Sequence, residues 1–213
     1  MEYCINNQWK NLKSGLTFLE NISNFIKPYN GGHKINIYAI SQNIDEYKFL
    51  TFTAESEDDA RYLDFNGQLL KNNWEPLKME IFKDKRKKKD TRSDDFDASC
   101  YYDGILIIND RIKKLFEKNI SNLVEMLPIY INGKNGFYYV NVINKIKSIN
   151  NYDTLTTEEF MEMVRKNKYD FNNNVTKGQI IFRDNDFISK YFITDIFIEI
   201  FGEIKGLKYE LVV

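Results

Sequence analysis

The chain has few of the residues that most often carry catalysis or bind metal ions. Its 213 residues include one histidine, His33, and two cysteines, Cys4 and Cys100. A single histidine has no partner at the spacing of a zinc-binding motif, so we interpret His33 as a surface residue in a turn. Two cysteines without CxxC spacing indicate no disulfide framework, and we expect both to be free thiols in a reducing compartment.

Other functional signatures are also missing. The sequence contains no GxSxG nucleophile motif and no glycine-rich phosphate loop after an apolar strand. No apolar run approaches the roughly 20 residues needed to span a bilayer, and the N-terminus lacks the apolar segment of a signal peptide. We therefore expect a cytoplasmic protein. With 30 basic and 31 acidic side chains the net charge is -1, which argues against a dedicated nucleic-acid or membrane-surface binder.

What the chain does contain is enough apolar material for a sizeable core. Hydrophobic residues make up 43% of the sequence and aromatic residues 15%. A chain of this length builds one domain, with room for a small appendage. Short strand-like and helix-like segments alternate irregularly, which predicts an α+β fold with a mixed, twisted β-sheet and short helices.

The clearest local pattern lies in residues 104–131. The apolar run Ile105–Ile108 predicts a buried strand, and Asn109 follows as a helix N-cap with Asp110 at the positive end of the helix dipole. Val124–Ile131 is typical of a second strand. Between them an apolar helical stripe is formed by Ile112, Leu115 and Phe116. The segment predicts a strand–helix–strand unit.

The same unit recurs near the C-terminus. Tyr191–Phe197 aligns with Leu106–Ile112, cap on cap. After one gap, Ile204–Leu207 aligns with residues 120–123 and Glu210–Val213 with residues 126–129. We expect the two helices to bury their apolar stripes against a common sheet, including Ile112 with Ile196 or Leu115 with Ile200.

Further elements complete the expected organisation. Strands are predicted near residues 35–40, 47–53, 77–82 and 137–143. An amphipathic helix is predicted from about residue 10 to 27, and a capping box, Thr156 to Glu159, starts another helix. Residues 1–43 then hold the N-terminal helix and first strand, packed on a main domain of residues 44–213.

Three charged features allow alternative interpretations. The basic run Lys83–Arg92 is either a nucleic-acid patch or a solvated loop, and the absence of interleaved aromatic residues favours the loop. Glu46–Lys48 and Glu203–Lys205 match part of a metal-nuclease pattern at a frequency expected by chance. Asp184 and Asp186 either hold a cation or form a tight turn, and the turn is favoured. A metal-dependent nuclease and a nucleic-acid-binding adaptor remain the alternative functions.

Several segments of residues 44–213 occur in the order known from one protein family. They are Gly67 with Trp74–Pro76, Ser93–Phe96, Ile107–Leu115, Glu125–Ile129, Tyr139–Val142, Ile181–Arg183, Phe192–Asp195 and Gly206–Tyr209. In these segments the chain resembles the Imm11-type immunity proteins of bacterial polymorphic toxin systems. Residues 1 to about 43 lie outside the resemblance.

The resemblance implies a cytosolic antidote that binds and neutralises a cognate toxin domain without catalysis. It implies no catalytic residue, cofactor or metal. Many toxin domains are nucleases with basic clefts, so acidic side chains are candidates for contacting the partner. The candidate residues are Asp94, Asp95 and Asp97 in one loop and Glu158, Glu159 and Glu162 in the capping-box helix.

Overall fold

The computed structural model describes residues 35–53, 56, 67–82, 90–101, 105–187 and 190–212. The chain divides into two compact units, residues 1–34 and 35–213. The helix predicted over residues 10–27 and most of the basic run lie outside the described residues. All of the described residues belong to the second unit.

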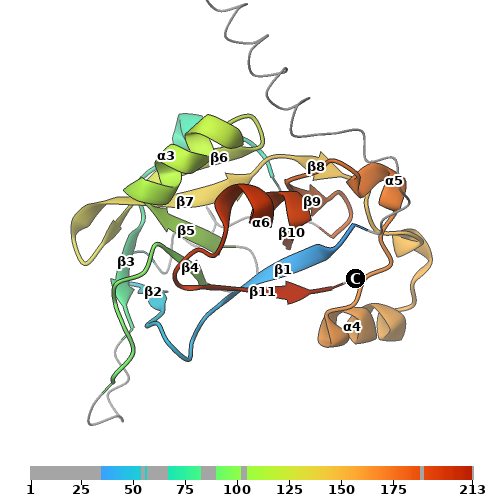
Figure 1. The fold of residues 1–213 in the computed structure, drawn as a ribbon, viewed down its shortest axis with the longest axis horizontal. Coiled ribbons are helices and arrows are strands. Elements are labelled where there is room, and N and C mark those ends of the chain that lie inside the picture. Colours follow the sequence, from blue (N-terminus) through green and yellow to red (C-terminus); the bar gives the residue numbers. More distant parts are fainter. Residues whose placement is uncertain are drawn as a thin grey trace, which may run out of the picture. The chain divides into compact units, whose positions relative to one another are not determined.

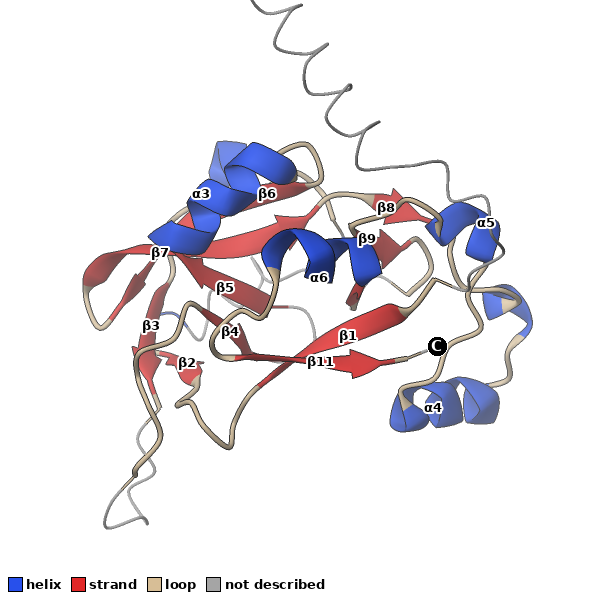
Figure 2. Cartoon of the chain, viewed as in Figure 1, coloured by secondary structure: helices blue, strands red, loops and turns tan. Residues whose placement is uncertain are grey.

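The described elements alternate irregularly along the chain, and the α+β class is confirmed (Figures 1 and 2). The helices are α3 (Asp110–Asn119), α4 (Thr157–Lys166), α5 (Asn173–Thr176), α6 (Asp195–Phe201) and the short 3-10 turns η2 (Lys71–Asn73) and η3 (Tyr152–Thr154). The strands are β1 (Ile37–Gln42), β2 (Leu50–Phe52), β3 (Lys78–Ile81), β4 (Ala98–Tyr101), β5 (Ile105–Asn109), β6 (Val124–Ile131), β7 (Lys134–Val142), β8 (Lys145–Ile146), β9 (Ile181–Asp184), β10 (Tyr191–Thr194) and β11 (Leu207–Leu211). None of the described helices is both long and apolar enough to cross a membrane.

The strands form two sheets, and each sheet is mixed. One has five strands in the order β11-β1-β10-β9-β8, where only β8 and β9 are parallel. The other has six strands in the order β2-β3-β6-β7-β5-β4, where only β3 and β6 are parallel. The predicted mixed sheet is thus divided between two layers of one domain.

The repeated strand–helix–strand unit is confirmed as β5–α3–β6 and β10–α6–β11. Both helices begin at the predicted caps. The Asn109 side chain accepts a hydrogen bond from the Ile112 N–H at 3.1 Å, and the Thr194 hydroxyl accepts one from the Ile196 N–H at 3.3 Å. A polar side chain that occupies the free N–H groups of the first turn is what starts a helix at a given residue.

The repeat extends beyond the segments that align in the sequence. In each unit the two strands flank a third strand that is antiparallel to both, which is β7 in one unit and β1 in the other. The middle strand carries the same contact in both units. Tyr138 on β7 donates to Asp110 at 2.9 Å, and Tyr38 on β1 donates to Asp195 at 2.8 Å. The middle strand follows its unit in the first case and precedes it in the second, so chain order hides the equivalence.

The predicted alignment of the last strand with the first unit, which placed Leu207 on residue 123, is shifted by one residue. Val124 pairs with Val142 on β7, and Leu207 pairs with Gln42 on β1, so Leu207 is the counterpart of Val124 rather than of residue 123. The reason is helix length. α3 has ten residues and α6 has seven, and the longer turn after α6 restores only part of the difference.

The inner core lies between the sheets and includes both helices. Phe116 of α3 and Phe197 of α6 are fully buried, with ring centroids 5.9 Å apart. Ile112 is buried as expected, but the expected burial of the stripe-mates on a common sheet is wrong. Leu115 is half-buried and Ile200 is 39% exposed. The helices instead belong to different sheets and meet each other through their phenylalanines.

The outer faces of the sheets carry separate cores. On the six-stranded sheet, Trp74 stacks on Tyr139 with their ring centroids 5.7 Å apart. Its indole N–H donates to the Pro128 carbonyl at 2.7 Å. On the five-stranded sheet an aromatic cluster includes Phe182 and Phe192, both fully buried. Aromatic side chains bury large areas, so each sheet is covered on both faces with few elements.

The sheets are joined where β4 meets the turn before β11. The Lys205 carbonyl accepts hydrogen bonds from the N–H groups of Asp97 and Ala98, each at 3.0 Å. The Gln42 side chain accepts from the Cys100 N–H at 2.7 Å. The approach is close enough that a Cβ atom on Gly206 would lie 2.0 Å from the Ala98 carbonyl oxygen. Only glycine fits at this junction.

Candidate protein-binding surfaces

The first group of predicted partner-binding residues lies in the loop before β4, and each acidic side chain there has a cationic partner. Asp94 lies 3.6 Å from Lys48, and Asp95 lies 3.1 Å from Lys205. Asp97 forms a two-pronged ion pair with Arg111, one arm of which is 3.0 Å long. Their charges are therefore balanced within the chain, which weakens any long-range attraction for a basic partner.

Asp97 contributes mainly to the fold. Its side chain is only 13% exposed, and it also accepts a hydrogen bond from the Asn109 side chain at 2.9 Å. The hydrogen bond from Arg111 lowers the pKa of Asp97, against the opposing effect of burial. Because Asn109 caps α3, Asp97 fixes the start of that helix.

The second group lies on α4, whose start is set by the predicted capping box. The Thr156 hydroxyl accepts from the Glu159 N–H at 3.3 Å, and the Glu159 carboxylate accepts from the Thr156 N–H at 2.8 Å. The hydrogen bond from the Thr156 side chain, followed by that from its backbone, lowers the pKa of Glu159. The carboxylate of Glu159 is therefore already engaged in the cap.

The remaining face of α4 points away from the core. Phe160, Met163 and Val164 pack against the aromatic cluster of the five-stranded sheet. The opposite side, which we name the α4 outer face, consists of Glu158, Met161, Glu162 and Arg165, all of them exposed at the spacing i, i+3, i+4, i+7. Met161 is 60% exposed. Glu162 pairs with Lys166 at 2.5 Å, and Glu158 has no partner among the described residues.

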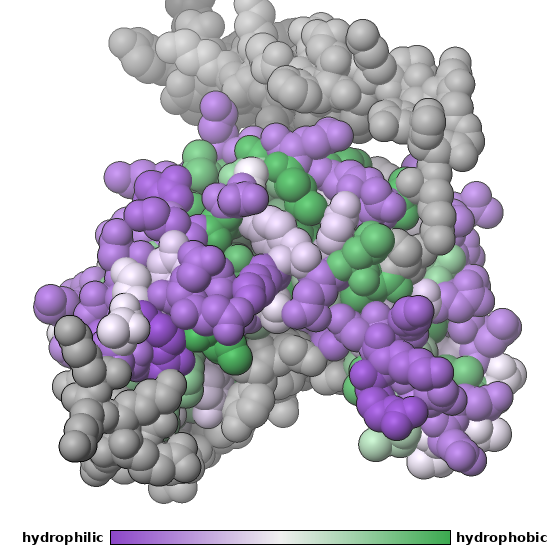
Figure 3. All heavy atoms as spheres, turned by 60° about the horizontal axis from the view of Figure 1, so that its bottom comes forward, coloured by the Kyte–Doolittle hydropathy of each residue, from purple (hydrophilic) through white to green (hydrophobic). Residues whose placement is uncertain are grey.

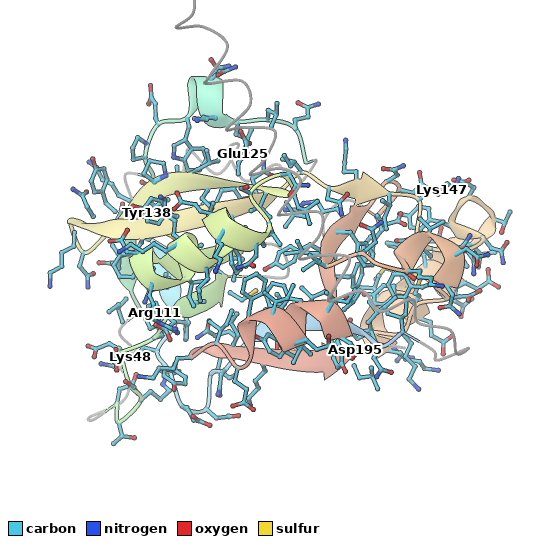
Figure 4. The ribbon with its side chains drawn as sticks, turned by 45° about the horizontal axis from the view of Figure 1, so that its top comes forward. Lys48, Arg111, Glu125, Tyr138, Lys147 and Asp195 are labelled. Atoms are coloured by element: carbon cyan, nitrogen blue, oxygen red, sulfur yellow. The ribbon has the colours of Figure 1, made fainter. Side chains whose placement is uncertain are left out.

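The structure does not bring the two acidic groups together. Phe96, in the first loop, packs on the outer face of the six-stranded sheet, whereas α4 packs on the outer face of the five-stranded sheet. Figure 4 places Lys48 and Arg111 at one end of the molecule and Lys147, which precedes α4, at the other. In Figure 3, α4 comes forward at the lower right, within a mostly hydrophilic surface. The sequence analysis did not identify Met161 as a binding residue. The one sequence feature that could have identified it is its position as an apolar residue on the polar side of a helix.

The paired carboxylates considered for a cation have a structural role at Asp184. This side chain is fully buried and accepts five hydrogen bonds, from the N–H and hydroxyl of Ser148 and the N–H groups of Ile149, Asp186 and Phe187, at 2.6 to 3.1 Å. Burial alone would raise the pKa of Asp184, but these hydrogen bonds outweigh it and hold the pKa below its ordinary value. The predicted tight turn is confirmed only in its second half. Arg183 and Asp184 end strand β9, and the chain bends at Asn185 and Asp186, where the Asp184 side chain accepts from the next N–H groups.

No metal-binding cluster accompanies these surfaces in the described part of the chain. No group of three or more histidine, cysteine, aspartate or glutamate side chains there is placed to hold a metal ion. Glu203, of the second nuclease-like triplet, is exposed after α6. A shallow, open depression of about 660 Å³ lies where β3 meets β6, with Lys78, Glu80 and Tyr130 among its lining residues.

A buried polar group in the interior joins the two sheets. Arg183 on β9 is fully buried and donates from Nε to the Val142 carbonyl on β7 at 3.0 Å. Its guanidinium lies 5.4 Å from the ring centroid of Tyr191, a favourable cation–π distance. Cys100 is a buried free thiol that donates to the Ile40 carbonyl at 3.6 Å. The two hydrogen bonds connect strands of different sheets, and the cation–π contact joins neighbouring strands of one sheet, so all three serve the fold.

No protein family model matches the chain, and no curated protein matches its sequence. Its function must therefore be inferred from its own residues and from the surface that they present.

Proposed function

We propose that this protein is an immunity protein that binds a cognate bacterial toxin domain in the cytoplasm and neutralises it by occlusion, without catalysis. The observation that carries the proposal is the α4 outer face. It presents an exposed methionine, Met161, with Glu158 and Glu162 beside it, on a helix held rigid by its cap and its packing. Methionine is enriched in protein–protein interfaces, where charged residues form the rim.

The positions of the family-like segments support the proposal at the level of the fold. Ile107–Leu115 spans β5 and the first turns of α3, and Phe192–Asp195 spans β10 and the start of α6. Gly206, in another such segment, lies at the junction where no side chain fits. Five of the eight segments that carry the resemblance thus lie in the repeat, including its middle strand β7, and the other three lie outside it. Such a distribution of the family-like segments favours an architecture shared with the immunity proteins.

An antidote that acts by occlusion needs a large and stable interface. Competition with substrate calls for about 1,200–2,000 Å² of total buried surface and nanomolar affinity, or about −12 kcal/mol. The α4 outer face supplies the centre of such an interface, and the surrounding surface supplies the rest. Glu158, which has no ionic partner among the described residues, adds negative charge that attracts a basic cleft and raises the association rate, whereas Glu162 is already paired with Lys166.

The test is reconstitution with the toxin domain encoded beside this gene. Mixing the purified proteins should give a complex of fixed stoichiometry, and inhibition of the toxin should follow that stoichiometry without improving over time. Sub-stoichiometric, time-dependent protection would mean that the protein destroys the toxin or its product, and the proposal would be wrong.

Variants of α4 test the site. Met161→Ala should raise the dissociation constant of the complex at least tenfold, about 1.4 kcal/mol, because a central apolar contact is lost. Glu158→Lys with Glu162→Lys should slow association. The matched control is Glu80→Lys with Glu199→Lys, which makes the same charge change at exposed positions on β3 and α6. Equal effects in the two double variants would show that net charge, and not this face, governs binding.

A further inference from the structure

The outer edge of β11 carries backbone groups that the described fold does not use. At the two ends of the β1–β11 ladder, the Asn43 N–H donates to the Gly206 carbonyl and the Val212 N–H donates to the Ile37 carbonyl, each at 2.9 Å. Hydrogen-bonded pairs alternate in an antiparallel ladder, so residues 206, 208, 210 and 212 face β1. The backbone groups of Leu207, Tyr209 and Leu211 therefore point outward. Among the described residues only the Leu207 N–H is engaged, with the Ile204 carbonyl at 3.1 Å.

Two other strand edges in the described fold are occupied. β6, the counterpart of β11 in the other repeat, is covered on its outer edge by β3, whose Leu77 and Met79 carbonyls accept from the Tyr130 and Asn132 N–H groups at 2.8 and 2.9 Å. The edge strand β4 is capped by the Lys205 carbonyl and the Gln42 side chain. An exposed strand with unpaired backbone groups is a template for pairing with another chain. The second repeat has such a strand at β11.

The sequence of β11 matches itself when read in the opposite direction. Leu207–Leu211 is Leu-Lys-Tyr-Glu-Leu. Antiparallel pairing centred on Tyr209 places Leu207 opposite Leu211 of a second copy and Lys208 opposite Glu210. Period-two alternation keeps the leucines and tyrosines on one face and the charges on the other. Each charge therefore meets an opposite charge, and the exposed Leu211, at 59%, meets an apolar partner.

The hydrogen-bond pattern fits the same register. Tyr209 stands at the centre as a hydrogen-bonded pair, donating to and accepting from Tyr209 of the second copy. The Leu211 N–H of each chain then donates to the Leu207 carbonyl of the other, and this carbonyl is among those that point outward. Lys208 and Glu210 form the non-hydrogen-bonded pairs, in which side chains lie closest. Shifting the register by one residue would leave the outward groups without partners.

We propose that two copies of this chain associate through antiparallel pairing of β11 about a twofold axis at Tyr209, which joins their five-stranded sheets into one continuous sheet. The interface is isologous, so each residue contact occurs twice. It uses a different surface from the α4 outer face. Failure of toxin binding and failure of self-association are therefore separate outcomes.

The first experiment is analytical ultracentrifugation of the full chain over a range of concentrations. A concentration-dependent dimer is expected. Leu211→Pro should abolish it, because proline removes an N–H that points outward and leaves the ladder with β1 intact. Circular dichroism should show an unchanged fold. A wild-type protein that stays monomeric at all concentrations would overturn the proposal and leave the edge to some other partner.

Charge reversal identifies the register. Lys208→Glu alone and Glu210→Lys alone each place like charges opposite one another, and each should raise the dimer dissociation constant on the order of tenfold. Mixing the two single variants restores opposite charges across both pairs, so a heterodimer should form with near wild-type affinity. The double variant should likewise dimerise. Lys208→Glu also loses the ion pair with Asp45 at 2.5 Å, and Glu210→Lys loses hydrogen bonds from Ser41 and Asn167 within the chain. These losses persist in the mixed heterodimer and in the double variant, so they cannot produce the rescue. Lack of rescue on mixing would refute the pairing.

Discussion

Replacing Gly206 by alanine should destabilise the protein more than the same change at any other glycine of the described turns. Gly206 has φ +99°, a conformation that costs an L-residue about 1–2 kcal/mol. The added Cβ would also lie 2.0 Å from the Ala98 carbonyl oxygen and 3.1 Å from the Phe96 Cβ. Ala98 is held in β4 opposite Ile108, so relief requires movement of the backbone at the junction of the sheets. We expect a total loss of at least about 3 kcal/mol.

Gly178→Ala is the matched control. Gly178 has a similar positive φ of +79°, but a Cβ atom added there would have nothing within 4 Å. This variant should therefore lose only the conformational contribution of about 1–2 kcal/mol. The difference between the two variants isolates the steric cost of separating the sheets.

Denaturant unfolding of both variants and the wild type measures this difference. For a domain of this size, a change of 1 kcal/mol in the free energy of unfolding corresponds to about 2–4 °C in the thermal midpoint, Tm. Gly206→Ala should therefore lower Tm by about 6–12 °C or more. If Gly206→Ala loses no more free energy than Gly178→Ala, the close approach of Gly206 to β4 does not hold in solution.

Three further predictions follow from single contacts and from the sequence. Asp184→Asn should cost about 2–4 kcal/mol at pH 7, because the amide cannot accept all five hydrogen bonds. The pKa of Asp184 is lower in the folded than in the unfolded protein, so the carboxylate stabilises the fold above about pH 4 and this contribution is lost as the pH falls. Unfolding measured from pH 7 to pH 3 should therefore show a shrinking difference in unfolding free energy between the variant and the wild type. A constant difference would contradict the assignment. Phe116→Ala should cost about 3–5 kcal/mol in chemical denaturation, whereas Leu115→Ala, at a half-buried position, should cost less than about 2, and equal losses would mean that the two positions are buried alike. Replacing Lys85–Lys89 with serine should change the free energy of unfolding by less than about 0.5 kcal/mol and leave toxin neutralisation intact, while a loss of neutralisation would place the basic run in the interface.

Local features were readable from the sequence because their causes are local. The N-caps at Asn109 and Thr194 and the capping box at Thr156 each depend on hydrogen bonds that span two or three residues. The strand predicted at Val124–Ile131 has the bounds of β6, and the strand predicted near residues 137–143 overlaps β7, which begins earlier at Lys134. In each cap the side chain and the backbone group that it bonds lie within one turn of each other.

The acidic side chains depend instead on partners that are distant in the sequence. Asp94, Asp95 and Asp97 form a cluster in sequence, and clustering alone suggested an electrostatic surface. Their lysine and arginine partners come from positions 46, 110 and 14 residues away, so the sequence does not show that the charges are balanced. The apolar spacing of Phe160, Met163 and Val164 indicates the buried side of α4 from the sequence, and packing added that Met161 on the opposite side is exposed.

Short-range hydrogen bonding and apolar periodicity specify the strand–helix–strand unit, its duplication and the caps that start both helices, so these were predictable from the residues alone. The role of β1, which completes the second unit as β7 completes the first, became clear from the folded chain. β1 pairs with strands about 155 and 170 residues further along the chain, and such pairing depends on the burial of distant apolar faces against each other. The same long-range packing places β3 along the edge of β6 and leaves the outer edge of β11 without a neighbouring strand among the described residues.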